Sequence, residues 1–152
     1  MPEEAFGRIV AIARKPGRGE PMAPVERTHL TEDGTLAESA RSHPRRGVTL
    51  LSEERWAEVA GELGVPLPWH TRRANVLVAG LELGELIGSR VRIGAAELDI
   101  LGETEPCQNM DRQHPGLRAA LVPDCRGGVH GRVLAAGDIA VGDRVVVVAE
   151  RP

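Results

Sequence analysis

Glycine and proline divide this chain into short segments, and this division constrains the fold more than any other feature. The 152 residues include 18 glycines and 11 prolines, and the apolar, β-rich runs between them are short. These runs cover residues 7–14, 48–51, 74–79, 89–94, 96–104, 128–135 and 144–149. Short strands set off by turn residues are typical of barrels and sandwiches rather than of parallel α/β sheets. The sequence therefore predicts a mainly β fold, a closed or partly closed β-barrel of about six or seven short strands with one or two short helices.

One segment has a clear helical pattern. Ser52 precedes two glutamates at the position of an N-cap, and apolar residues then recur at helical spacing as far as Leu63. Gly64 is a stop signal. We expect one helix here. The chain length fits one domain, so we also expect a single domain over residues 1–152.

Two regions read mainly as loops or turns. Residues 15–46 are dense in glycine, proline and polar residues, with a short strand expected around residues 25–30. Residues 136–143, AGDIAVGD, contain two Gly-Asp pairs that suit tight turns.

Composition excludes several functional classes. The net charge of -3 gives no general attraction to nucleic acid or to an anionic membrane surface. No apolar run approaches the ~20 residues that cross a bilayer, and the N-terminus lacks a secretory pattern. We therefore expect a cytoplasmic protein without a nucleic-acid or membrane partner. Its two cysteines are then free thiols, metal ligands or a nucleophile rather than a structural disulfide.

The residues with chemical potential concentrate between residues 103 and 131. Cys107 follows Pro106 just beyond an expected strand, which predicts a thiol at a rim where strand gives way to loop. Arg112 or His114 would favour the nucleophilic thiolate. A small, buried apolar cysteine is the alternative, and the residues alone leave both open.

Two other arrangements use the same stretch. Cys107, His114, Cys125 and His130 have the ligand types of a Cys2His2 zinc site, but their spacing is wider than that of a usual zinc knuckle. A Cys-His nucleophile pair would join Cys107 to His130 or His114, although no oxyanion donor is identifiable.

Arginines near glycines suggest anion binding. Arg126-Gly127-Gly128 resembles a turn in which backbone N–H groups approach an oxyanion beside a guanidinium. Arg72 and Arg73 would add anion contacts from the start of a strand. The alternatives are an ordinary turn and solvated surface charge.

Taken in order, three segments resemble the MOSC domain, the C-terminal domain of molybdenum cofactor sulfurases that also occurs as short bacterial proteins. They are RRANVLVAGLELGELIGSRVRIGAAELDILGETEPCQNMD, PGLRAAL and RGGVHGRVLAAGDIAVGDRV, within residues 70–148. The resemblance implies a barrel-like β fold and molybdopterin as partner. It assigns Cys107 as sulfur carrier or molybdenum ligand, in sulfur transfer or in reduction of N-hydroxylated compounds.

The same resemblance implies a cofactor site built from an Arg-x-Asn element and the Arg-Gly-Gly segment. Its members would be Arg73, Asn75, Arg126, Gly127, Gly128, His130 and Arg132. Residues 31–46 match the family only loosely, and Cys125 stands where glycine is expected. No lysine motif for pyridoxal phosphate is present, so a separate sulfur donor, such as a cysteine desulfurase, or an electron-donor protein is implied. The competing hypothesis is a non-catalytic β-barrel module that binds another anion or ligand and has lost the cofactor.

Overall fold

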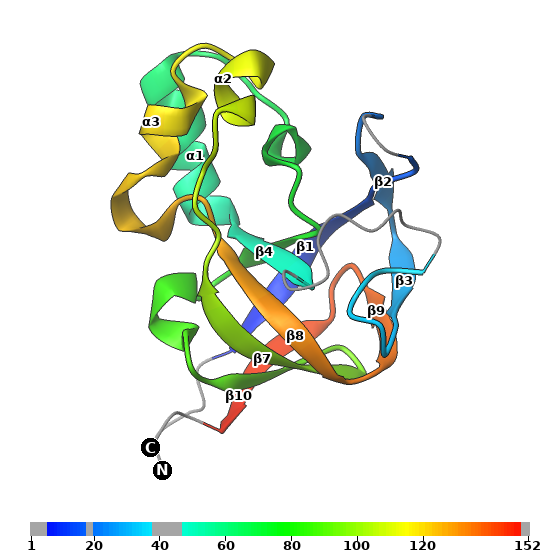
Figure 1. The fold of residues 1–152 in the computed structure, drawn as a ribbon. Coiled ribbons are helices and arrows are strands. Elements are labelled where there is room, and N and C mark those ends of the chain that lie inside the picture. Colours follow the sequence, from blue (N-terminus) through cyan, green and yellow to red (C-terminus); the bar gives the residue numbers. More distant parts are fainter. Residues whose placement is uncertain (1–5, 18–19, 38–46, 150–152) are drawn as a thin grey trace.

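A closed barrel of seven strands is the central feature of the computed structural model, which describes residues 6–17, 20–37 and 47–149 (Figure 1). Around the barrel the strands follow the order β1 (Phe6–Arg14), β10 (Arg144–Ala149), β6 (Arg90–Ile93), β7 (Ala96–Glu103), β8 (Val129–Ala135), β4 (Val48–Ser52) and β5 (Val76–Ala79), and β5 pairs with β1 to close it. β4 and β5 are parallel, and the other neighbours are antiparallel. The predicted mainly β barrel is confirmed.

Three further strands lie beside the barrel. β2 (Ala23–Val25) pairs with the end of β1, while β3 (Arg27–Leu30) and β9 (Gly137–Ala140) form a separate two-stranded ribbon. β3 accounts for the strand expected around residues 25–30. Residues 137–140 are a strand, although the sequence favoured turns there. The reason is a distant partner, since β9 pairs with a strand more than 100 residues earlier in the chain, which local turn signals do not reveal.

The predicted helix is confirmed as α1 (Glu53–Leu63). The Ser52 hydroxyl accepts a hydrogen bond from the Arg55 backbone N–H at 3.1 Å, and Gly64 ends the helix with a left-handed φ of 71°. Other helical segments of the described residues are short: α2 (Asn109–Gln113), α3 (Leu117–Leu121) and the 3-10 turns η1 (Trp69–Arg72), η2 (Leu83–Leu86) and η3 (Pro123–Cys125). The described part of the chain therefore contains more short helical segments than the one or two helices that the sequence predicts.

Two hydrophobic cores hold these elements together. The first fills the barrel, and β6 shows its pattern, because Val91 and Ile93 are buried while Arg90 and Arg92 point outward. The second lies between the outside of the barrel and the helices, and its fully or nearly buried members are Leu51, Trp56, Val59, Ala74, Leu77, Met110, Leu117 and Leu121. Strand β5 is buried along its whole length because it serves both cores.

The helices lie together on one side of the barrel, beyond the ends of β7 and β8 (Figure 1). The chain leaves β7, forms α2, α3 and η3 there, and returns to β8. The chemically rich stretch of the sequence is thus a helical excursion from the barrel. Residues 38–46, part of the segment that matches the family loosely, lie outside the described residues. No helix in the described part of the chain has the length and apolar character needed to cross a membrane.

Candidate functional site

Cys107 lies in the segment that links β7 to α2, and its side chain is exposed. The Cys107 carbonyl accepts a hydrogen bond from the Met110 backbone N–H at 3.0 Å, so the residue sits at the entry to α2. Met110 itself is 2% exposed and packs into the helix-side core. The placement is the strand-to-loop rim that the sequence predicts, and it presents the thiol to solvent.

Arg72, the last residue of η1, contacts both ends of this segment and is buried rather than solvated. Its Nε donates to the Gly127 carbonyl at 3.1 Å, and one terminal nitrogen donates to the Thr104 carbonyl at 2.9 Å. The other terminal nitrogen donates to the Met110 sulfur at 3.7 Å. The sequence predicts Arg72 as an anion contact or a solvated surface charge, because no periodic pattern around it indicates burial.

Arg73 and Asn75, the Arg-x-Asn pair, precede β5 and bond different parts of the chain. Arg73 has a left-handed φ of 65° and donates through Nη2 to the Glu20 carbonyl at 2.9 Å. The Asn75 side-chain oxygen accepts from the Thr49 backbone N–H at 3.0 Å. Asn75 therefore also extends the contact between β5 and β4.

Arg126 turns away from the glycines that follow it. Its guanidinium forms ion pairs with Glu62 and, at 3.3 Å, with Glu58, both on α1, and it donates to the Ala120 carbonyl at 3.1 Å. The Arg126 side chain is 11% exposed. An anion at this turn would have to exchange with these partners before it could bind the Arg126 guanidinium.

The two glycines of the turn are packed against neighbouring backbone. A Cβ at Gly127 would lie 2.6 Å from the Thr104 carbonyl oxygen, and one at Gly128 would lie 2.2 Å from the Leu50 carbonyl oxygen. The Gly128 backbone N–H donates to the Cys125 carbonyl at 3.0 Å. Close approach between segments therefore explains why glycine occupies both positions.

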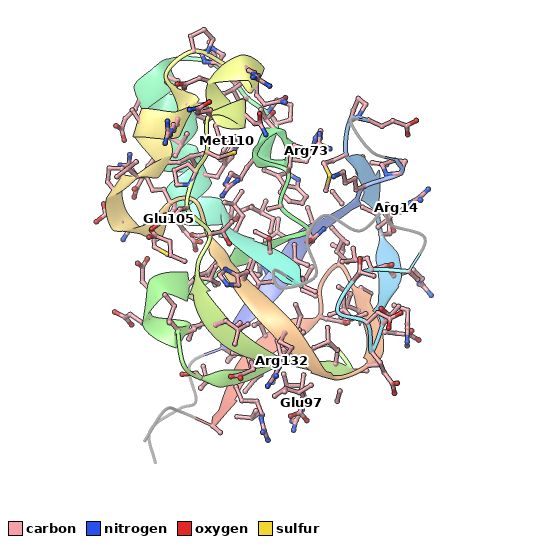
Figure 2. All side chains as sticks on the ribbon, in the orientation of Figure 1. Arg14, Arg73, Glu97, Glu105, Met110 and Arg132 are labelled. Carbon is pink, nitrogen blue, oxygen red and sulfur yellow. The ribbon has the colours of Figure 1, made fainter. Side chains whose placement is uncertain are left out.

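His130 and Arg132 lie on the face of β8 that points away from the barrel interior, alternating with buried Val129, Gly131 and Val133. The Arg132 side chain is 66% exposed, and Nη2 is 3.8 Å from the Asp99 carboxylate. Figure 2 shows Arg132 at the end of the barrel opposite to Arg73. The structure therefore does not bring these two arginines together.

Cys125 is half-buried and packs against the barrel core and Gly84. Burial, and then the nearby Glu103 carboxylate, raise the pKa of the Cys125 thiol to about 11. Cys125 and the preceding Asp124 both have left-handed φ values, 56° and 54°. At neutral pH Cys125 is thus a protonated thiol of low reactivity.

The zinc arrangement is not formed. Among the described residues, no group of three or more His, Cys, Asp or Glu side chains could hold a metal ion. His114 directs its Nδ1 to the Pro115 carbonyl at 2.9 Å. The four residues of the Cys2His2 alternative therefore do not converge, although all four are described.

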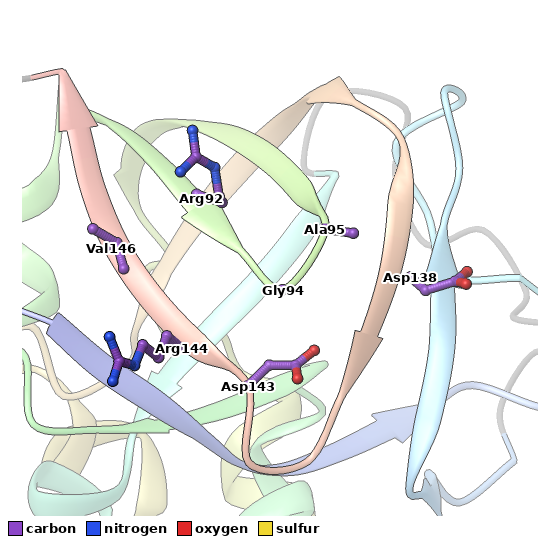
Figure 3. A pocket seen from close by; sticks show the side chains of 7 residues that line it. All are labelled: Arg92, Gly94, Ala95, Asp138, Asp143, Arg144 and Val146. Atoms are coloured by element: carbon purple, nitrogen blue, oxygen red, sulfur yellow. The ribbon is translucent and has the colours of Figure 1, made fainter.

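A pocket of about 520 Å³ lies elsewhere, where the β6–β7 turn meets β9 and β10 (Figure 3). Its charged residues already have intramolecular contacts. The Arg144 guanidinium lies 4.8 Å from the centre of the Phe6 ring, and the Asp143 carboxylate accepts from the Ala140 backbone N–H at 2.9 Å. None of the residues predicted to form the site lines this pocket.

By their chemistry, Cys107 and Arg73 each fit one part of a molybdopterin site. An exposed thiol is a soft donor suited to molybdenum. Arg73 makes one hydrogen bond to Glu20, and a guanidinium has five N–H donors, which leaves donors for a phosphate. Arg126 is held by two carboxylates of α1, and Arg132 lies at the other end of the barrel from Arg73 (Figure 2), so the fit rests on Cys107 and Arg73.

Comparison with known proteins identifies the fold and the family. The YuaD protein of Bacillus subtilis has a crystal structure that aligns with a TM-score of 0.77 at 21% identity, covering 97% of this chain and 98% of that one. YiiM of Geobacillus stearothermophilus aligns with a TM-score of 0.77 at 18% identity, over 93% of this chain and 75% of that one. YiiM of Escherichia coli gives 0.71 at 18% identity, over 94% and 70%. None of the curated proteins matches the chain significantly. The family model described as the MOSC domain matches residues 32–146, and the chain therefore belongs to the MOSC domain family.

Proposed function

We propose that this chain binds the molybdenum cofactor and that Cys107 is its reactive residue. The Cys107 thiolate would ligate molybdenum, and the same sulfur would carry a persulfide where the chain serves in sulfur transfer. The observation that carries the proposal is an exposed thiol at the strand-to-loop rim of a MOSC chain. A thiolate is both a soft metal ligand and the form of cysteine that accepts sulfur.

Cys107 and Arg73 would hold the cofactor on the side of the barrel that carries the helices. The Arg73 guanidinium would bind the phosphate, since it is only partly buried and its neighbour Arg72 contacts the Cys107 segment. The Asn75 side-chain oxygen accepts from the Thr49 N–H, and its amide nitrogen is a donor that would bind the cofactor. Gly127 and Gly128 would shape the turn rather than bind the cofactor, because both carbonyls and the Gly128 N–H already have partners within the chain.

Three other residues expected to bind the cofactor, Arg126, Arg132 and His130, could do so only after a change in the structure. Arg126 would have to release Glu58 or Glu62, and Arg132 lies at the other end of the barrel from Arg73 (Figure 2). His130 faces outward from β8. The proposal therefore assigns the central roles to Cys107 and Arg73 and supporting roles to these residues.

When bound, a molybdenum centre supplies two-electron redox and atom-transfer chemistry. In sulfur transfer, the Cys107 thiolate would attack the outer sulfur of a donor protein's persulfide and release the donor thiolate. A nucleophilic acceptor would then attack the outer sulfur on Cys107 with its own electron pair, so that the S–S bond breaks and the Cys107 thiolate is restored. In reduction of an N-hydroxylated compound, two electrons and two protons would convert the N–OH group to N–H and water. The two routes need a separate cysteine desulfurase and a separate electron-donor protein, respectively. Both routes would operate in the cytoplasm.

A non-catalytic binding module is the second candidate. The observation in its favour is that several arginines expected at a cofactor already have intramolecular partners, Arg126 with two carboxylates of α1 and Arg73 with the Glu20 carbonyl. In this reading the chain keeps the MOSC fold but binds a different anion or ligand.

Metal and pterin analysis separates the two candidates. The wild-type protein, Cys107→Ser and Cys125→Ser would be purified from a host that makes the molybdenum cofactor. We expect molybdenum and pterin in the wild type and in Cys125→Ser, and a strong loss of molybdenum in Cys107→Ser. Absence of molybdenum from the wild type, or equal molybdenum in all three proteins, would reject the proposal, and the first result would favour the binding module.

A further inference from the structure

We propose that Arg72 is a positioning residue that fixes where the Cys107 thiol stands, by holding both ends of the segment from Thr104 to Met110. The importance of this role rests on the proposed function, because it matters only if Cys107 is the reactive residue. The placement of the segment itself is a property of the protein alone. Arg72 acts through the chain on both sides of Cys107, by its bonds to Thr104 and Met110.

The burial of Arg72 requires specific partners. Arg72 is 6% exposed. Removing a guanidinium from water costs free energy unless its N–H groups form hydrogen bonds within the protein. Two of the bonds go to backbone carbonyls, those of Thr104 and Gly127, at 2.9 and 3.1 Å. A charged donor to a carbonyl is stronger than a neutral one, so these contacts hold the two carbonyls in fixed positions.

The two carbonyls mark the point where β7 and β8 separate. The last residue pair of the β7–β8 ladder is Glu103 with Val129, and one further bond joins the Thr104 N–H to the Gly128 carbonyl at 2.8 Å. Beyond that bond the strands diverge, one toward Cys107 and the other toward η3. The guanidinium of Arg72 lies in this fork and bonds the next carbonyl on each side.

Contacts of Arg72 also reach the far side of Cys107. Thr104 precedes the cysteine by three residues and Met110 follows it by three, and both contact the guanidinium. Met110 is anchored in the helix-side core and donates its N–H to the Cys107 carbonyl. The segment is therefore fixed at both ends with the exposed cysteine between them (Figure 2, where Glu105 and Met110 are labelled).

Gly127 provides an independent indication that the fork is tightly built. A Cβ there would lie 2.6 Å from the Thr104 carbonyl oxygen, 3.5 Å from an Arg72 terminal nitrogen and 3.5 Å from Pro106. A side chain at this position would push the Cys107 segment away from Arg72. The Arg-Gly-Gly sequence thus gives Arg72 access to both strands.

The test uses the apoprotein in a Cys125→Ser background, so that Cys107 is the single thiol. Arg72→Gln, Arg72→Lys and the matched control Arg118→Lys, whose side chain is exposed on α3, would be compared. Amide exchange measured by NMR follows the Thr104 and Met110 N–H groups, and the spectrum of a nitroxide on Cys107 follows the motion of the thiol.

We expect both amides to exchange about tenfold faster in Arg72→Gln, as loss of a charge-assisted hydrogen bond implies, with faster nitroxide motion. Amides of the β6–β10 ladder should not change, which separates positioning from general destabilisation. Arg72→Lys should give an intermediate effect, because an ammonium keeps the charge but lacks the fork that bonds two carbonyls. The control should resemble the background protein.

Unchanged Thr104 and Met110 amides in folded Arg72→Gln would overturn the inference, as would equal acceleration of all strand amides. If Arg72→Gln does not fold, Arg72→Lys and Gly127→Ala decide by the same two amides. No cofactor enters this experiment. A wild type without molybdenum would therefore reject the proposed function and leave the positioning result to stand or fall by the amides.

Discussion

Replacing Gly128 by alanine is predicted to destabilise the barrel strongly, because both backbone conformation and space exclude a side chain there. Gly128 has a φ of +88°, which L side chains rarely adopt. Its Cβ would lie 2.2 Å from the carbonyl oxygen of Leu50, a fully buried residue of β4. β4 pairs with β8, which begins at Val129, so any displacement disturbs the pairing of these strands.

The magnitude can be separated into two contributions with a matched control. Gly142 has a similar φ of +95° but no atom within 4 Å of a Cβ, so Gly142→Ala reports backbone strain alone, about 1–2 kcal/mol. In Gly128→Ala the Leu50 carbonyl must also move by roughly 1 Å. Breaking a buried backbone hydrogen bond adds about 1–3 kcal/mol. We expect a total loss of about 2–5 kcal/mol for Gly128→Ala, and the upper part of this range is unusual for one methyl group.

Urea unfolding followed by circular dichroism measures both variants. The free energy of unfolding should fall by a small amount in Gly142→Ala and by at least about twice as much in Gly128→Ala. Equal losses in the two variants would refute the reasoning, since they would show that the Leu50 carbonyl yields freely. The Arg-Gly-Gly glycines would then owe their identity to something other than close packing.

Four further outcomes follow from the contacts. In Cys107→Ser protein at pH 8, the native Cys125 thiol should be alkylated about 100-fold more slowly than in urea, because its raised pKa leaves little thiolate; an equal rate contradicts this. The raised pKa also makes stability depend on pH: the contribution of Cys125 to the free energy of unfolding is fully present below about pH 8.5 and is lost as the pH rises toward 11. The wild-type protein should therefore lose stability over this range relative to Cys125→Ser. Parallel curves of stability against pH would count against this. Asn75→Ala should cost about 1 kcal/mol in urea unfolding because the Thr49 N–H loses its acceptor, and no change would assign Asn75 no part in joining β4 to β5. Ser52→Ala should cost about 1 kcal/mol through loss of the N-cap bond to Arg55, and an unchanged midpoint would contradict that bond.

Local patterns were sufficient for the barrel and for α1. Alternation of Arg and apolar residues in β6 reflects one buried face, and the Ser52 and Gly64 caps mark the helix limits. The ribbon of β3 and β9 was less accessible. Residues 137–140 contain turn-forming Gly-Asp, and only pairing with distant β3 makes them a strand.

In the candidate site, too, local sequence predicts some features, while others depend on contacts between distant segments. The rim position of Cys107 is a local signal, because Pro-Cys follows the end of an expected strand. Its reactive role is implied by the resemblance to the MOSC domain, since the residues alone leave a buried cysteine open. Arg72 gives no such signal, because its burial depends on two strands that meet only in the folded barrel. Arg126 resembled an anion-binding residue, but Glu58 and Glu62 are four residues apart on one face of α1 and together bind its guanidinium. Their spacing was visible in the sequence, whereas the docking of α1 beside η3 was not.

The sulfur coordination of bound molybdenum tests the central claim most directly. X-ray absorption at the molybdenum edge would be measured on the loaded wild-type protein, on Cys107→Ser at matched molybdenum content, and on Cys125→Ser as control. The account predicts one fewer sulfur ligand in Cys107→Ser and an unchanged number in Cys125→Ser. The same sulfur number in wild type and Cys107→Ser would contradict the assignment of Cys107 as the ligand.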